Sequence, residues 1–322
     1  MPYEIVLFFS QIETKDGKMI NKKVWNFCSH YQKKFETKDY PQPRIVAKMC
    51  DSLCENGVMS VMFRGGIDNA DNSYHSVIRN NDVIETPYLQ AYYKKKLSYL
   101  AFGFKYIYED FKKYVLPIVY TNSKGDRSLG TGFLYSNGLI TARHCIEGAS
   151  KISIKGILSS ELRKADFKIP TNDYLDLLYI RFENQIPDTL MFSEEANILD
   201  EVMTLGYPKI PGYHCLITAE NATVAARYTT SVGQIATEAE EIWTREKLFL
   251  ITAKIKGGNS GGPVISKTGS IVGVSVSLSQ GEGDYDNLGY GTVIPVKFVD
   301  DLLASESNNY LETSKIEFED FE

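Results

Sequence analysis

The chain has 322 residues, of which 43% are hydrophobic and 24% charged, and its formal net charge is −6 at pH 7. This composition is typical of a folded globular protein, and the length leaves room for two domains. No apolar run approaches the roughly 18 residues of a membrane span, and the apolar stretch IVLFF follows Glu4 without a cationic segment. We therefore expect neither a membrane anchor nor a signal peptide.

Charge divides unevenly along the chain. Residues 1–114 contain 17 Lys and Arg against 13 Asp and Glu, whereas the remainder contains 18 against 28. The acidic remainder argues against nucleic-acid binding there. The basic first part permits a nucleic-acid module, which a salt-sensitive gel shift would test, but scattered lysines usually form a solvated surface. We expect no nucleic-acid partner.

Five cysteines, an odd number spread over a long chain, do not form the pattern of a disulfide framework. This favours the cytoplasm. Cys50 and Cys54 could share a helical face and recruit a metal with His30 or His75, but no second close pair completes a zinc set. We interpret them as buried thiols and expect no metal and no cofactor.

Residues 1–114 favour helices. The segment 21–36 carries a stripe of apolar residues at helical spacings of three and four, which predicts a helix: Val24, Phe27, Cys28, Tyr31 and Phe35. A second helix is expected after Pro43, with its end at Gly57, then a short strand over 57–63, and one long aromatic helix over 87–115. This order predicts a small helical or winged-helix-like module.

After Leu116 the sequence changes to short apolar runs bounded by turn residues, a rhythm typical of a Greek-key barrel or sandwich. The runs are LPIVYT, GTGFLYS, GLITA, SKISIKG, LDLLYIRF, EVMTLGYP, LFLITAK, GPVIS, SIVGVSVSL and YGTVIP. They predict a mainly β domain over residues 115–304. The acidic stretch 305–322 is expected to be a mobile tail.

The run GGNSGGP, residues 257–263, raises the question whether Ser260 is a nucleophile or only part of a tight turn. Nucleophilic catalysis by serine needs a neutral imidazole, a carboxylate that orients it, and two backbone N–H groups aimed at the oxyanion. Gly258 and Ser260 are spaced so that their N–H groups can point into one concavity. The imidazole and the carboxylate must come from elsewhere.

Only four histidines exist. His30 and His75 lie in the helical first part and His214 lies in GYHCLI, whereas His144 follows the apolar strand GLITA, where a side chain can reach the mouth of a barrel. For the carboxylate, Asp176 leads directly into the apolar run 177–180 and is preferred. Asp173, next to Asn172, is typical of a turn or cap.

The motifs TARHC, DLLYI and GNSGGP, in the order His, Asp, Ser, resemble the signatures of the chymotrypsin-like (trypsin-like) serine peptidases over roughly residues 115–300. GTGF and GYGTVIP add to a likeness to the HtrA-type branch. The resemblance implies two six-stranded antiparallel barrels with a catalytic triad in the cleft between them. It assigns Ser260 as nucleophile, His144 as general base and acid, and Asp176 as the orienting carboxylate. The N–H groups of Gly258 and Ser260 would form the oxyanion hole.

Three features depart from the family pattern. Cys145 occupies the position of a disulfide cysteine in secreted relatives, but SLGTGFLY holds no partner for it, which strengthens the cytoplasmic interpretation. Asn259 replaces the Asp that pairs with a newly cut N-terminus in zymogens, so we expect control by the N-terminal module, by assembly or by ordering of the loop before Ser260. About two dozen residues follow TVIPV, too few for a PDZ domain.

The substrate pocket is expected to involve Thr252, Lys254, Ile255, Ser275 and Ser277. Lys254 could favour an acidic side chain by charge pairing, or it could point outward and leave a pocket for small or medium apolar side chains. We favour the apolar pocket. Profiling Lys254→Ala against a peptide library distinguishes the two.

The sequence therefore predicts a cytoplasmic serine endopeptidase that acts on a protein or peptide substrate. A regulatory partner would bind through residues 1–114. A helical module on a disulfide-free trypsin-like domain also resembles bacterial defence proteases in architecture. The alternatives are a catalytically inactive protease-like binding protein and a latent protease that awaits its partner.

Overall fold

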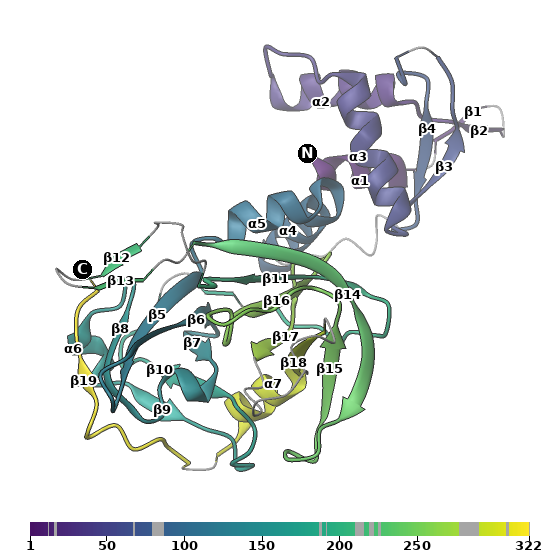
Figure 1. Cartoon of the computed structure of the whole chain (residues 1–322). Coiled ribbons are helices and arrows are strands. Elements are labelled where there is room, and N and C mark those ends of the chain that lie inside the picture. The colour runs from purple at the N-terminus through teal and green to yellow at the C-terminus, as the bar shows by residue number, and fades with distance from the viewer. Residues whose placement is uncertain are drawn as a thin grey trace. The chain divides into compact units, whose positions relative to one another are not determined.

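The computed structural model divides into two compact units, Met1–Ile107 and Tyr108–Glu322 (Figure 1). The residues that the structure does not describe are 12, 16–17, 67, 79–86, 187–188, 191, 210–215, 219–221, 225–226, 277–289, 307–308 and 322. His214 and Ser277, considered above, therefore lie outside the described residues. Among the described helices, none has both the length and the apolar character needed to span a bilayer.

The first unit is helical, as predicted, and also carries two β hairpins. Its elements are α1 (Pro2–Ser10), β1 (Glu13–Lys15), β2 (Lys18–Ile20), α2 (Val24–Phe35), α3 (Pro43–Glu55), β3 (Met59–Phe63), β4 (Ser73–Ser76) and α4 (Pro87–Phe102). Helices α2 and α3 precede the β3–β4 hairpin along the chain. Helix α1 was not predicted from the short apolar run that forms it.

The core of this unit is built from one face of each helix. Phe9 of α1, Phe27 of α2 and Leu53 of α3 are at most 2% exposed and belong to one apolar cluster. Cys50 is fully buried in the same cluster, and burial raises the pKa of its thiol. Within the described part of the chain no group of His, Cys, Asp and Glu side chains forms a metal site. Cys50 thus packs as a small apolar residue, as the sequence indicated.

The long helix expected over 87–115 is interrupted. Gly103 has a φ of +70°, and its N–H donates to the Tyr99 carbonyl, so α4 ends and α5 (Phe104–Phe111) begins as a separate helix. The boundary between the units falls within α5, seven residues before the predicted boundary. The reason is aromatic packing: the ring of Tyr108 lies 4.9 Å from that of Tyr228, and Phe111 packs against Tyr114 in the second unit.

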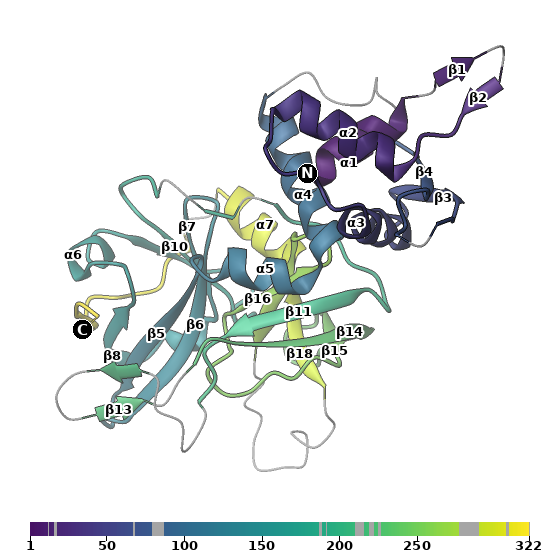
Figure 2. The same ribbon diagram turned by 90° about the horizontal axis from the view of Figure 1, so that it is seen from above.

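The second unit consists of two β bodies that lie side by side in Figure 2, and their strands are antiparallel except for the pair β19–β8. The first is a sheet in the order β19-β8-β5-β6-β7-β10-β9, and the second is a closed six-stranded barrel in the order β11-β14-β15-β18-β17-β16. Their strands are β5 (Val115–Asn122), β6 (Arg127–Tyr135), β7 (Gly138–Thr141), β8 (Ala149–Ile154), β9 (Asp166–Lys168), β10 (Leu178–Arg181), β11 (Glu201–Gly206), β14 (Thr229–Glu240), β15 (Lys247–Ile251), β16 (Pro263–Ser266), β17 (Ile271–Val276), β18 (Gly291–Pro295) and β19 (Glu317–Phe318). The remaining elements are η2 (Arg143–Cys145), α6 (Ser159–Leu162), β12 (Leu216–Thr218), β13 (Ala222–Val224) and α7 (Val296–Ala304).

The mainly β prediction is confirmed, and every apolar run quoted above falls on a strand, but only the second of the two expected barrels is closed. The first sheet is open, with β19 and β9 at its two ends, and the C-terminal segment adds the parallel strand β19 beside β8. That segment was expected to be a mobile tail. Instead, Phe318 is 5% exposed and stacks on Phe167 with ring centroids 5.6 Å apart. The apolar residues among its acids explain the difference, since they bury against the sheet.

Candidate active site

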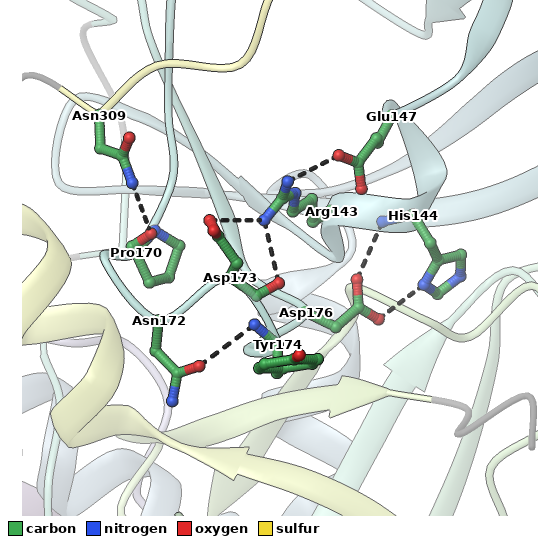
Figure 3. Close-up of polar contacts among 9 residues, drawn as sticks. All are labelled: Arg143, His144, Glu147, Pro170, Asn172, Asp173, Tyr174, Asp176 and Asn309. Atoms are coloured by element: carbon green, nitrogen blue, oxygen red, sulfur yellow. Dashed lines mark hydrogen bonds and ion pairs between the residues drawn. The ribbon is translucent and has the colours of Figure 1, made fainter. Parts of the chain in front are cut away.

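His144 is placed by the end of a buried strand. Strand β7 ends at Thr141, and the chain then makes the one-turn helix η2, which turns the His144 side chain outward, 43% exposed. The His144 N–H donates to Oδ1 of Asp176 at 2.9 Å, and its ring Nδ1 lies 2.6 Å from Oδ2 of the same carboxylate (Figure 3). Two hydrogen bonds to one carboxylate fix both the backbone and the ring of this residue.

The carboxylate changes the chemistry of the imidazole. Burial of the ring lowers the pKa of His144, but hydrogen bonds with Asp176 and Cys145 more than offset this and raise that pKa well above its usual value. A carboxylate at Nδ1 also holds the tautomer in which Nε2 can accept a proton. The pair therefore combines a general base, the imidazole, with a carboxylate that orients it.

The two candidate aspartates both lie in the loop before β10, but their surroundings differ. Asp176 precedes the fully buried Leu177 and faces His144. Asp173 has a 76% exposed side chain, and its carbonyl accepts a hydrogen bond from Nη1 of Arg143 at 3.1 Å. Arg143 also donates through Nη2 to Glu147 at 2.6 Å, so it ties η2 to the loop (Figure 3).

Ser260 lies in a buried turn and is 3% exposed. Its carbonyl accepts a hydrogen bond from Thr131 N–H at 2.9 Å and lies 3.8 Å from Sγ of Cys145. The next residue, Gly261, has a φ of +84°, and a Cβ there would lie 2.6 Å from the backbone nitrogen of Ala142. The Ser260 turn is thus packed directly on the backbone that leads into His144.

Gly258, the other predicted oxyanion residue, also needs to be glycine. Its φ is +100°, and a Cβ there would lie 2.5 Å from the Tyr207 carbonyl oxygen. Its carbonyl accepts a 2.6 Å hydrogen bond from Oγ1 of Thr131, and Oγ1 of Thr131 in turn accepts one from the N–H of Tyr207 at 3.0 Å. Thr131, fully buried in β6, therefore fixes the turn, a role that sequence reasoning missed although GTGF had been noted.

The predicted pocket residues separate into groups. Thr252 and Lys254 are exposed, and Ile255 is half-buried beside Gly291. Ser275 is a correction: it is fully buried, and its hydroxyl donates to the carbonyls of Asn259 at 2.8 Å and Gly262 at 3.0 Å. It supports the Ser260 turn and cannot line an open pocket.

Comparisons with known proteins show which proteins this chain resembles. Residues 130–274 match the model of the trypsin-like peptidase domain, a segment that contains His144, Asp176 and Ser260. The chain is 25% identical over 170 residues to the magnetosome formation protease MamE of Magnetospirillum gryphiswaldense, covering 51% of this chain and 20% of that protein. It is 26% identical over 189 residues to a probable periplasmic serine endoprotease, DegP-like, of Chlamydia trachomatis, covering 56% and 34%.

The chain thus spans between a fifth and about a third of the length of these two relatives. A solved structure of the Rv3671c protease of M. tuberculosis in its active form matches with a TM-score of 0.48 and 20% identity, over 64% of this chain and 87% of that one. Residues 130–274 thus match a trypsin-like peptidase domain, and the two relatives named above are proteases, one of them DegP-like.

Proposed function

We propose that this protein hydrolyses peptide bonds of a protein substrate through Ser260, His144 and Asp176. The observation that carries the proposal is the contact of His144 with Asp176 through both its backbone N–H and its ring Nδ1. Packing of the Ser260 turn on the strand end before His144 supports it.

The mechanism follows from these positions. The Ser260 hydroxyl attacks the scissile carbonyl while Nε2 of His144 accepts its proton, and the Asp176 carboxylate stabilises the imidazolium. The negative charge that develops on the carbonyl oxygen is met by the N–H groups of Gly258 and Ser260. His144 then gives its proton to the leaving amine. A water molecule, activated by the same imidazole, releases the acyl group from Ser260.

A fluorophosphonate probe, which reacts with activated serines, tests the proposal on the full chain. We expect the wild type to be labelled and both Ser260→Ala and His144→Ala to lose labelling. The first substitution removes the nucleophile, and the second removes the base that activates it. Ser123→Ala and His30→Ala are matched controls, because both residues are exposed and distant in sequence from Ser260. Both variants should be labelled like the wild type. Labelling that survives in Ser260→Ala would exclude this serine. If the wild type is not labelled, the two remaining hypotheses are the inactive binding protein and the latent protease.

We further propose that the protein works in a reducing compartment, the bacterial cytoplasm, under control of its first unit and within a defence system. The free thiols of Cys28, Cys50, Cys54 and Cys145 support the compartment, whereas the name of the chlamydial relative says periplasmic. Fractionation of the host cell distinguishes these: recovery from the periplasm would refute the cytoplasmic location.

A further inference from the structure

The C-terminal segment 309–321, here called the strap, follows α7 and runs along the edge of the first sheet (yellow in Figure 1). One side of the strap pairs with β9 and the residue after it. Tyr310 forms an antiparallel bridge with Lys168, the Ile169 N–H donates to the Asn309 carbonyl at 3.0 Å, and the Leu311 N–H donates to the Phe167 carbonyl at 2.8 Å.

The far end of the strap pairs with β8, which lies at the opposite edge of the strand order. The Glu319 N–H donates to the Ile152 carbonyl at 2.9 Å, and Lys151 forms ion pairs with Glu317 at 3.0 Å and Glu319 at 2.6 Å. Nη2 of Arg163 donates to the Phe318 carbonyl at 2.9 Å. The strap therefore joins the two edge strands of the sheet, β8 and β9.

Beyond β9, the chain enters the loop 169–176 that presents Asp176. Polar contacts from three different elements hold this loop, and those of Asn309 and Arg143 are drawn in Figure 3. At its start, Nδ2 of Asn309 donates to the Pro170 carbonyl at 2.9 Å. In its middle, Nδ2 of Asn172 donates to the Thr244 carbonyl at 2.9 Å, in the turn between β14 and β15. Arg143 holds the Asp173 carbonyl, and Asp176 then meets His144.

We infer that Asn309 is a positioning residue for the Asp176–His144 pair, an inference whose catalytic meaning rests on the proposed function. Through its carbonyl and its side-chain amide, Asn309 holds the backbone on both sides of the Ile169–Pro170 peptide. Pro170 has no N–H of its own to offer, so its carbonyl is the only backbone group with which it can anchor the start of the loop.

The anchor at Pro170 matters because Asp176 makes two short hydrogen bonds with His144. A carboxylate that must accept from both the N–H and Nδ1 of His144 tolerates little displacement of its backbone, and catalytic geometry is sensitive to shifts of about 1 Å. Loss of the Asn309 side chain frees the start of the loop while Asn172 and Arg143 still hold its middle. The expected result is a loosened pair in a folded protein.

The test compares Asn309→Ala and the near-isosteric Asn309→Asp, both of which lose the amide donor, with Asp320→Ala. Asp320 accepts from the Ser159 N–H at 2.7 Å at the other end of the strap, so it controls for general loosening of the strap. The first readout is the NMR titration of the His144 imidazole, assigned with His144→Ala. We expect the His144 pKa to fall in both Asn309 variants and to stay at the wild-type value in Asp320→Ala.

The second readout is the pH profile of fluorophosphonate labelling. Both Asn309 variants should show a lower midpoint and a high-pH plateau reduced by about three- to tenfold, the effect of one hydrogen bond. A merely structural role scales the rate equally at every pH. An unchanged His144 titration, or the same shift in Asp320→Ala, overturns the inference. If the His144 titration shifts in the Asn309 variants but the wild type is not labelled by the probe, the positioning role stands and the proposed activity is refuted.

Discussion

At the scale of single residues, the charge of Asp176 sets the pH range in which His144 can act as a base. Asp176→Asn keeps the size of the side chain but removes the carboxylate, so the pKa of His144 should fall. We expect the labelling rate of the wild type to rise with pH to a midpoint above the ordinary value of about 6.5. The variant should have a lower midpoint and a rate reduced by about four orders of magnitude, as in the triad enzymes where this change has been made.

Linkage gives the same variant a second signature. The raised pKa of His144 contributes stability that is fully present below pH 6.5, the ordinary pKa, and is lost as pH rises through the raised pKa in the folded protein. The lead of the wild type over Asp176→Asn in thermal unfolding should therefore shrink at alkaline pH. A midpoint of labelling that is equal in the two proteins would contradict this role of the carboxylate.

The site residues that sequence reasoning proposed, and the supporting residues that it overlooked, differ in how far away their partners lie. His144, Asp176 and Ser260 sit in local motifs, so their side-chain chemistry and neighbours could be recognised from short stretches. Thr131 acts on Gly258, 127 residues away, and Asn309 acts on Pro170, 139 residues away. An isolated threonine or asparagine carries no sign of such a partner, because only the fold brings the two groups together.

At the scale of elements, apolar runs predicted the buried strands well, whereas strands made mostly of polar or exposed residues were missed. Strand β14 was missed because most of its residues are exposed or half-buried and follow no apolar alternation. Strand β19 was missed because two residues within an acidic stretch carry no periodicity. Both strands are held by pairing with neighbours already in place, β11 and β15 for β14 and β8 for β19. Such strands depend on tertiary context.

Phe318→Ala tests whether the strap is an integral part of the sheet. The ring is 5% exposed and stacks on Phe167, so its removal should lower the free energy of unfolding by about 3 kcal/mol. Tyr310→Ala, at a 42% exposed position of the same strap, should cost much less. Urea unfolding measures both, and limited proteolysis should cut the strap faster in Phe318→Ala. Equal stability of Phe318→Ala and wild type would restore the interpretation as a mobile tail.

At the scale of the whole molecule, the change from helices to strands predicted a boundary after residue 114, whereas the two compact units divide after Ile107. The sequence pattern changes where β5 begins, at Val115, yet Phe111 and Tyr114 are already buried in the second unit. The Tyr114 carbonyl accepts from the Leu134 N–H at 2.8 Å. A helix can thus belong by its packing to the β unit that follows it, which no local pattern reveals.

This boundary decides how control by the first unit is tested. A truncation to residues 115–322 removes α5 and exposes the surface around Tyr228, so we expect it to be less stable than residues 104–322, which keep α5. If the first unit regulates the protease, the labelling rate of residues 104–322 should differ from that of the full chain by at least about tenfold, a coupling within the usual range. A faster truncated chain makes the first unit an inhibitor, and a slower one makes it an activator. Equal rates in two folded proteins, checked by thermal unfolding, would rule out regulation by residues 1–103.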